Sequence, residues 1–85
     1  MRKLGELAKG MTGVIARTEG PVDVRRRLLE MGFLEGSTVE LVHEAPFGGD
    51  PIAVKVRGSL LALRRSEANL IEVTDVRSSA RGGRP

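Results

Sequence analysis

Residues 52–63 read IAVKVRGSLLAL, in which large apolar side chains alternate with other residues up to a glycine, and a second apolar run follows. Alternation with a period of two is typical of a strand that has one buried face. Gly58 and Ser59 suit a tight turn, because glycine most easily adopts the positive φ of a first turn position. The stretch therefore predicts a β-hairpin. Its buried face would carry Ile52, Val54 and Val56.

The same alternation recurs on both sides of this hairpin. It predicts strands at residues 38–41 and 71–74, and residues 14–17 form a further run typical of a strand. We find no connection that suits the crossover of a parallel βαβ unit. Short antiparallel strands in a small domain tend to close on themselves, which removes exposed edges. We expect a mainly β fold, a small antiparallel barrel of about five strands. The other buried positions would be Val39, Leu41, Ile71 and Val73.

The segment after Pro21 follows a helical period instead. Its apolar residues recur at i, i+4 and i+7, which is one face of a helix. Proline suits the first helical position, and Gly32 can adopt the left-handed conformation that ends a helix. The pattern predicts one α-helix at residues 22–31, inserted in the barrel as a lid on the core. Its apolar face consists of Val24, Leu28 and Met31. Later in the chain, Ser66 is predicted to cap a single helical turn.

Charge and composition restrict the classes of function. The chain of 85 residues has a net charge of +3, from 14 basic and 11 acidic residues. Three basic residues, Arg77, Arg81 and Arg84, lie in residues 77–85, which leaves 11 basic against 11 acidic residues in residues 1–76. Two Phe, no Trp and no Tyr offer few rings on which bases could stack or which could wall a groove for proline-rich peptides. The composition argues against nucleic acid as a partner.

The chain is predicted to form one domain followed by a tail. Residues 1–76 would be the folded domain, and residues 77–85, which lack large apolar side chains after Arg77, a disordered basic tail. The absence of cysteine excludes a disulfide framework and fits a reducing compartment. No apolar run has the length of a signal peptide or of a membrane span. These features predict a cytoplasmic protein.

Several short motifs occur along the chain in an order and spacing that can be compared with those of known families. RLLEMG at residues 27–32 precedes EGS at residues 35–37, PFGGDPI follows at residues 46–52, and VRG and LRRSEA lie at residues 56–58 and 63–68. In this order and spacing the chain resembles the FeoA family over roughly residues 4–76. The matched positions to which the resemblance gives a structural role are Arg27, Leu28, Met31, Gly32, Gly36, Gly49, Asp50, Pro51 and Gly58.

The resemblance implies an SH3-like barrel and a role in bacterial ferrous iron uptake. FeoA proteins are small cytosolic accessories of FeoB, a membrane permease with a cytosolic GTP-binding domain. Related domains also end metal-dependent repressors of the diphtheria-toxin-repressor type, but this chain shows no preceding DNA-binding domain. The expected function is therefore that of an adaptor that binds the cytosolic region of FeoB and is recruited through it to the inner face of the membrane.

Five residues are the candidates for contact with that partner. Leu29 points away from the apolar face of the predicted helix, on the same side as Val22. Phe47 is one of two aromatic residues and lies in a glycine-rich loop, and aromatic residues are frequent interface hot spots. Arg25 and Arg26 could contact an anion or an acidic partner. The alternatives are a structural loop, a solvated helix with pairs of charges four residues apart, such as Asp23 with Arg27, and self-association into a homo-oligomer.

No catalytic residue, cofactor site or small-molecule substrate is predicted. His43 is the only histidine and the one weak candidate for a metal ligand, with Glu44 and Asp50 nearby in sequence. It is in phase with Val39 and Leu41, so we expect it to face inward, and it lacks the clustered spacing of a dedicated metal site. Two other functions stay open: a metal-responsive SH3-like domain that binds a transition metal weakly, and a small basic barrel that binds nucleic acid.

Overall fold

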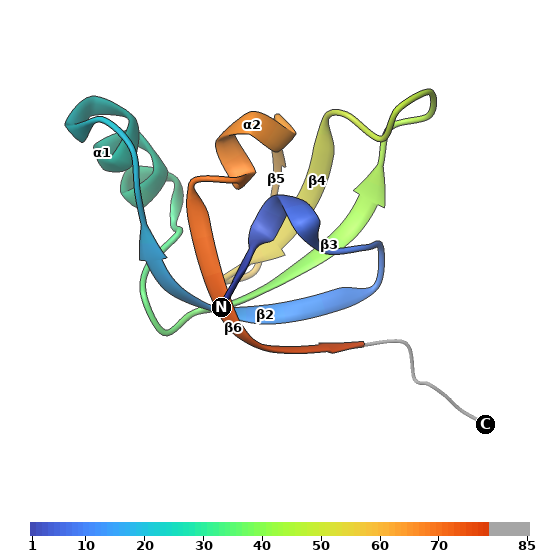
Figure 1. The fold of residues 1–85 in the computed structure, drawn as a ribbon, viewed down its shortest axis with the longest axis horizontal. Helices are drawn as coiled ribbons and strands as arrows, with labels where there is room; N and C mark the ends of the chain where they lie inside the picture. Colours follow the sequence, from blue (N-terminus) through green and yellow to red (C-terminus); the bar gives the residue numbers. More distant parts are fainter. Residues whose placement is uncertain (79–85) are drawn as a thin grey trace.

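The computed structural model describes residues 1–78, with secondary structure over most of that length (Figure 1). The elements are β1 (Arg2–Lys3), the 3₁₀ helix η1 (Leu4–Glu6), β2 (Met11–Thr18), α1 (Val22–Met31), β3 (Thr38–Glu44), β4 (Ile52–Val56), β5 (Ser59–Leu63), α2 (Arg65–Ala68) and β6 (Ile71–Ser78). Strands dominate, as the alternating pattern predicts.

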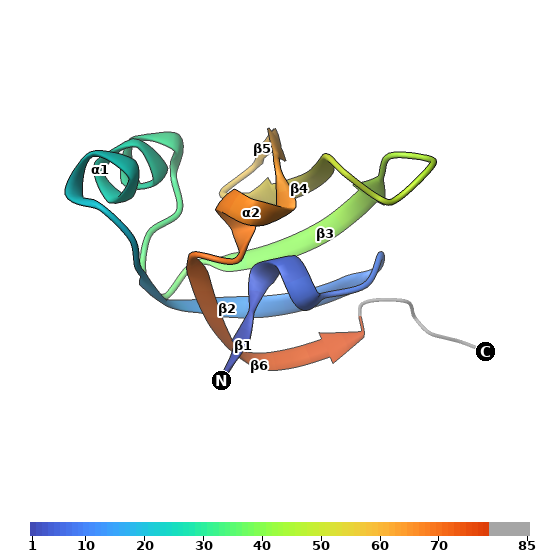
Figure 2. The same ribbon diagram turned by 45° about the horizontal axis from the view of Figure 1, so that its top comes forward.

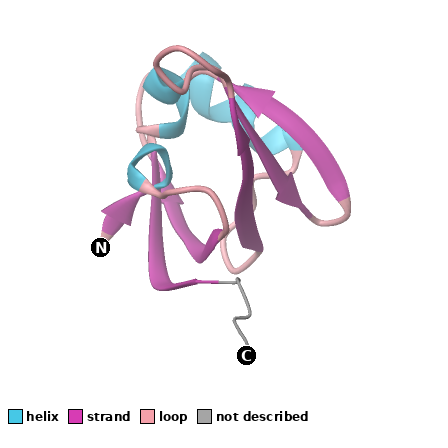
Figure 3. Ribbon diagram, turned by 90° about the vertical axis from the view of Figure 1, so that its right-hand side faces the viewer, coloured by secondary structure: helices cyan, strands magenta, loops and turns pink. Residues whose placement is uncertain are grey.

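The strands form one antiparallel sheet in the order β1-β6-β2-β3-β4-β5. This sheet coils around a common interior, and the helices gather at one end of it (Figures 1 and 3). η1 and α2 contact each other across that end, and α1 stands beside them between β2 and β3 in the chain (Figure 2). The five predicted strands correspond to β2 to β6. The sixth strand, β1, pairs with β6. It has only two residues, which is too short for a periodic pattern to reveal.

The core lies where the alternation places it. Each apolar strand residue predicted to face inward has at most 1% of its surface exposed. These residues are Val39, Leu41, Ile52, Val54, Val56, Ile71 and Val73. The other members of the cluster are Ile15 and Leu63 in the sheet and, outside it, Leu4, Leu7, Leu28, Phe33 and Ala68. Because burying one such side chain contributes about 1.5–3 kcal/mol, a domain of this size depends on nearly all of them.

The helix α1 spans the predicted residues without an error at either end. Its only fully buried residue is Leu28, and Val24 and Met31 are partly buried against the core. Gly32 has a φ of 111°, and the N–H of Phe33 donates to the carbonyl of Leu28 at 3.1 Å. This left-handed ending directs Phe33 into the core. The prediction for Pro21 was off by one position, since it precedes the first helical residue.

Two short-range predictions are wrong in detail. The β4–β5 turn consists of Arg57 and Gly58, with φ values of 51° and 83°, so Ser59 already pairs with Val56 in the sheet. Positive φ at both turn residues is the geometry that suits the twist of a two-residue hairpin. Ser66 does not cap α2. The Glu67 carboxylate does so instead, accepting a hydrogen bond from the N–H of Arg64 at 3.0 Å.

The last strand runs beyond Val76, the residue at which the sequence analysis ends the domain. β6 continues to Ser78, where it pairs with Met11, and Arg77 pairs with Thr12. Backbone pairing with β2 extends the strand although its last side chains are exposed. The remainder of the predicted tail, residues 79–85, lies outside the described residues.

Candidate partner-binding surface

The helix α1 presents two apolar side chains to solvent. Val22 is 58% exposed and Leu29 is 44% exposed, whereas the adjacent Leu28 is fully buried. Both therefore lie off the face that covers the core, on the side that the helical period indicates. Arg25 and Arg26 are exposed on the same helix. The helix thus has one face in the core and apolar area left over for contact with another molecule.

Phe47 lies in the β3–β4 loop, residues 45–51, and is completely exposed at 101%. It has a φ of 62°, and Gly48 and Gly49, which follow it, also have positive φ. The loop and α1 stand at opposite ends of one side of the molecule, with α2 between them (Figure 1). The structure therefore does not gather Phe47 and Leu29 into one patch. A single partner would have to span α2 to reach both.

One arginine organises the loop, Arg65, which the sequence analysis placed only within the matched LRRSEA motif. The Arg65 guanidinium donates to the carbonyl of Gly49 at 2.8 Å, to the carbonyl of Gly5 at 2.6 Å and to the Glu44 carboxylate at 2.9 Å. Its backbone N–H donates to the Asp50 carboxylate at 3.0 Å. We call Arg65, Glu44, Gly49, Asp50 and Gly5 the clamp. It joins η1, the end of β3, the loop and α2.

The clamp explains two of the matched motif residues. Asp50 fixes the loop by accepting the N–H of Arg65, so its partner lies 15 residues further along the chain. A Cβ added to Gly49 would lie 3.0 Å from a carboxylate oxygen of Glu44 and 3.3 Å from Nη2 of Arg65. The glycine therefore leaves room for the ion pair of Glu44 and Arg65. Glu44 is held in turn, because its second oxygen accepts the N–H of Lys9 at 3.1 Å.

A second ion pair links the two helices. Nη2 of Arg27 lies 2.8 Å from the Glu67 carboxylate, so α1 is tied to α2. The sequence analysis expected Arg27 to pair with Asp23, four residues earlier on the helix. Within residues 1–78 the ion pair of Arg27 is with Glu67 instead. The side chains of Arg27 and Glu67 are 57% and 30% exposed, so this link contributes little free energy.

His43 is the clearest wrong placement. It is exposed, and the reason is a bulge in β3: Leu41 pairs with Val54 but His43 pairs with Ala53, the very next residue of β4, so Val42 is an extra residue. One extra residue reverses the alternation of the strand beyond it. Within residues 1–78, no three His, Cys, Asp or Glu side chains come together as a metal site would require.

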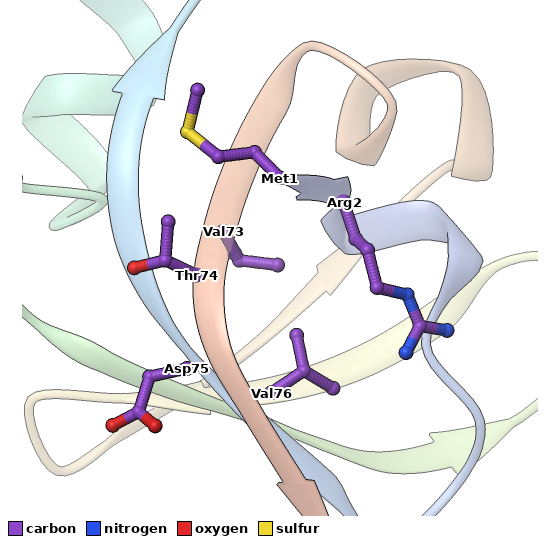
Figure 4. A pocket seen from close by; sticks show the side chains of 6 residues that line it. All are labelled: Met1, Arg2, Val73, Thr74, Asp75 and Val76. Carbon is purple, nitrogen blue, oxygen red and sulfur yellow. The ribbon is translucent and has the colours of Figure 1, made fainter.

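An open depression of about 260 Å³ lies against β6, next to β1. Met1, Arg2 and residues 73–76 line it, and Figure 4 shows the Asp75 carboxylate pointing away from Arg2. Asp75 instead pairs with Nε of Arg77 at 2.9 Å. The lining brings no group of titratable side chains together, so its geometry suggests no chemistry.

Comparison with known proteins now adds the family. The sequence model of the FeoA domain matches residues 2–75. The chain belongs to the FeoA family. The solved structure of Stenotrophomonas maltophilia FeoA, complexed with zinc and described as an SH3 domain protein, has a TM-score of 0.82 at 32% identity and covers 94% of this chain and 100% of that one. Chlorobium tepidum FeoA has a TM-score of 0.79 at 36% identity, over 98% of this chain and 80% of that one.

A curated relative connects this FeoA protein to transport. The Fe(2+) transport protein A/Fe(2+) transporter FeoB fusion protein of Porphyromonas gingivalis is 41% identical over 78 residues. The match covers 92% of this chain but only 9% of that protein, so most of the relative has no counterpart here. The expected SH3-like fold and the family's link to ferrous iron transport are confirmed. No helix of residues 1–78 is both long and apolar enough to cross a membrane.

Proposed function

We propose that this FeoA protein is an adaptor of ferrous iron uptake that binds the cytosolic region of a FeoB permease. The observation that carries the proposal is the P. gingivalis relative, in which Fe(2+) transport protein A and the transporter FeoB are fused in one chain. Fusion keeps a binding domain at a high effective concentration near its partner. Whether or not the two share a chain, a FeoA domain needs a docking surface to contact its partner.

The exposed apolar side chains of α1 and of the β3–β4 loop supply that surface. Leu29 and Val22 offer aliphatic area at one end, and Phe47 offers a full aromatic ring at the other. Stable interfaces bury about 800 Å² on each partner, and one partner that contacts both anchors would have to extend over α2. Anchors of this kind at the two ends fix the orientation of a partner as well as its affinity.

The adaptor would act by favouring one conformation of the permease. A bound protein shifts an equilibrium only by its difference in affinity for the two states. Any effect on nucleotide hydrolysis would therefore arise within FeoB and depend on how well each of its states fits α1 and Phe47. The site of action would be the cytoplasmic face of the membrane, where FeoB holds its cytosolic region.

Titration calorimetry with the purified FeoB cytosolic region tests this. Phe47→Ala and Leu29→Asp should each weaken binding about 30-fold, the size of an interface hot spot. Leu60→Asp is the matched control, because Leu60 is also a solvent-facing leucine, 67% exposed, on β5. It should change the affinity by less than about twofold.

The proposal fails if Phe47→Ala and Leu29→Asp bind like the wild type while their folds are intact. Permease-dependent iron uptake by cells that carry each variant gives the functional readout and should follow the same order. Homo-oligomerisation, weak metal binding at His43 and nucleic-acid binding stay predictions, and no contact among residues 1–78 favours them over the adaptor.

A further inference from the structure

We infer that Arg65 is a positioning residue: through the clamp it holds the β3–β4 loop so that Phe47 is presented to the partner in its binding conformation. This inference rests on the proposed function, and it names the residue that controls one of the two anchors. Arg65 itself lies in α2, and its three side-chain nitrogens all donate within the protein, so its route to Phe47 is through the loop.

The loop is held at its base and along the side that follows Phe47. The N–H of Ala45 donates to the carbonyl of Pro51 at 3.0 Å, which closes the base. Arg65 then fixes Gly49 and Asp50, which come two and three positions after Phe47. The loop backbone is thereby fixed next to Phe47, although the ring itself is wholly exposed.

The arginine is itself immobilised from two other segments. Gly5 of η1 and Glu44 at the end of β3 accept two of its side-chain hydrogen bonds. A planar guanidinium can serve three acceptors at once in a fixed geometry, whereas a lysine ammonium on a flexible stem cannot hold all three in place. The position of Phe47 is therefore set by parts of the chain that lie outside its own loop.

This arrangement affects binding through entropy. An exposed aromatic residue on a mobile loop would lose backbone freedom when it entered a pocket, and each residue so ordered lowers the affinity about tenfold. The clamp orders the loop before the partner arrives, so this loss is already incurred on folding. Loosening the clamp should weaken binding even though no interface atom changes.

A double-mutant cycle separates positioning from contact. With the FeoB cytosolic region as ligand, Arg65→Lys should weaken binding about tenfold in the wild-type background and less than about twofold in the Phe47→Ala background. Arg64→Lys is the matched control: Arg64 is the exposed neighbour and its side chain lies outside the clamp, so any change in affinity should be equal in the two backgrounds.

A second variant loosens the clamp without changing Arg65. Gly49→Ala places a Cβ against Glu44 and Arg65, whereas Gly48→Ala, also at positive φ, meets nothing within 4 Å. Both carry a backbone penalty, but only Gly49→Ala should reproduce the loss of affinity. Amide hydrogen exchange gives a readout that needs no partner: the N–H groups of Ala45 and of residue 65, which donate to Pro51 and Asp50 at the base of the loop, should exchange faster in Arg65→Lys and Gly49→Ala than in Gly48→Ala.

The outcomes distinguish the inference from the function on which it rests. Equal effects of Arg65→Lys in both backgrounds, or unchanged exchange of these two amides, overturn the positioning role while the adaptor survives. An affinity that falls with Phe47→Ala but not with Arg65→Lys or Gly49→Ala does the same. Failure of the wild-type protein to bind the FeoB cytosolic region overturns the adaptor itself, and with it the partner named here.

Discussion

The two ends of the proposed surface are held in place in different ways. At one end, α1 starts, ends and turns into the core through contacts within a few residues: Gly32 closes the helix, and Phe33 bonds back to Leu28. At the other end, the β3–β4 loop depends on Arg65, which lies 15 and 16 residues from the loop positions that it binds and 60 residues from Gly5.

This contrast shows which parts of a small domain its local sequence can specify. A helix with an apolar face of helical period and a glycine at its end has its limits specified locally, and it is stabilised when that face packs on a core. A loop without a packed side chain has no such local code, and its conformation is the result of the rest of the fold. The two anchors should therefore respond differently to substitutions inside and outside their own segments.

Leu28→Ala should produce the largest effect on stability, because Leu28 is the only fully buried side chain of α1. We expect a loss of about 2–5 kcal/mol in the free energy of unfolding, from lost transfer energy and the cavity left behind. Urea unfolding followed by far-ultraviolet circular dichroism measures it, since the chain has no Trp or Tyr for fluorescence. Leu29→Ala is the control and should cost less than about 1 kcal/mol. Equal losses of stability for Leu28→Ala and Leu29→Ala would mean that α1 packs on both faces. Its position would then not be set by one locally specified face, and α1 would not differ from the loop in this respect.

Much of the fold was predictable because each barrel strand reports its buried face by alternation. Val54 and Val56, or Ile71 and Val73, point inward whatever their neighbours in the sheet are. Alternation gives the wrong face where the backbone departs from the period of two and no residue type in the sequence indicates the departure. Val42 is such a place: nothing in the residues announces a bulge, so His43 was assigned to the wrong face.

The site was predictable only in part, for a related reason. Leu29 and Phe47 could be selected because apolar side chains outside a core pattern are visible in a sequence. Arg65 could not, since an arginine becomes a clamp only when acceptors from distant segments surround it. Two of its acceptors are the backbone carbonyls of Gly5 and Gly49, and a carbonyl carries no sequence signal at all.

Glu44→Gln should have an intermediate effect and probes the distant support of the loop. The change removes the charge that pairs with Arg65 while leaving an oxygen to accept a hydrogen bond. We expect a loss of about 1–2 kcal/mol in the same unfolding experiment, since hydrogen bonds to charged groups exceed neutral ones by roughly this amount. Glu30→Gln, on the exposed side of α1, should change the stability by less than about 0.5 kcal/mol. A neutral outcome for Glu44→Gln would show that the clamp holds without its ion pair and that the backbone acceptors suffice.

Arg27→Gln should give the smallest effect, yet it addresses the contrast most directly, because Arg27 ties α1 to α2, the element that carries the clamp. An exposed ion pair of this kind contributes about 0.2–1 kcal/mol, and high salt should abolish that difference. A double-mutant cycle with Glu67→Gln isolates the pair, since the glutamine oxygen can still accept the N–H of Arg64. If α1 is locally determined, the coupling energy should remain within this range. A coupling energy well above about 1 kcal/mol would mean that α1 and α2 form one unit. A change in α1 would then reach Phe47 through Arg65, and the two anchors could no longer be treated as independent.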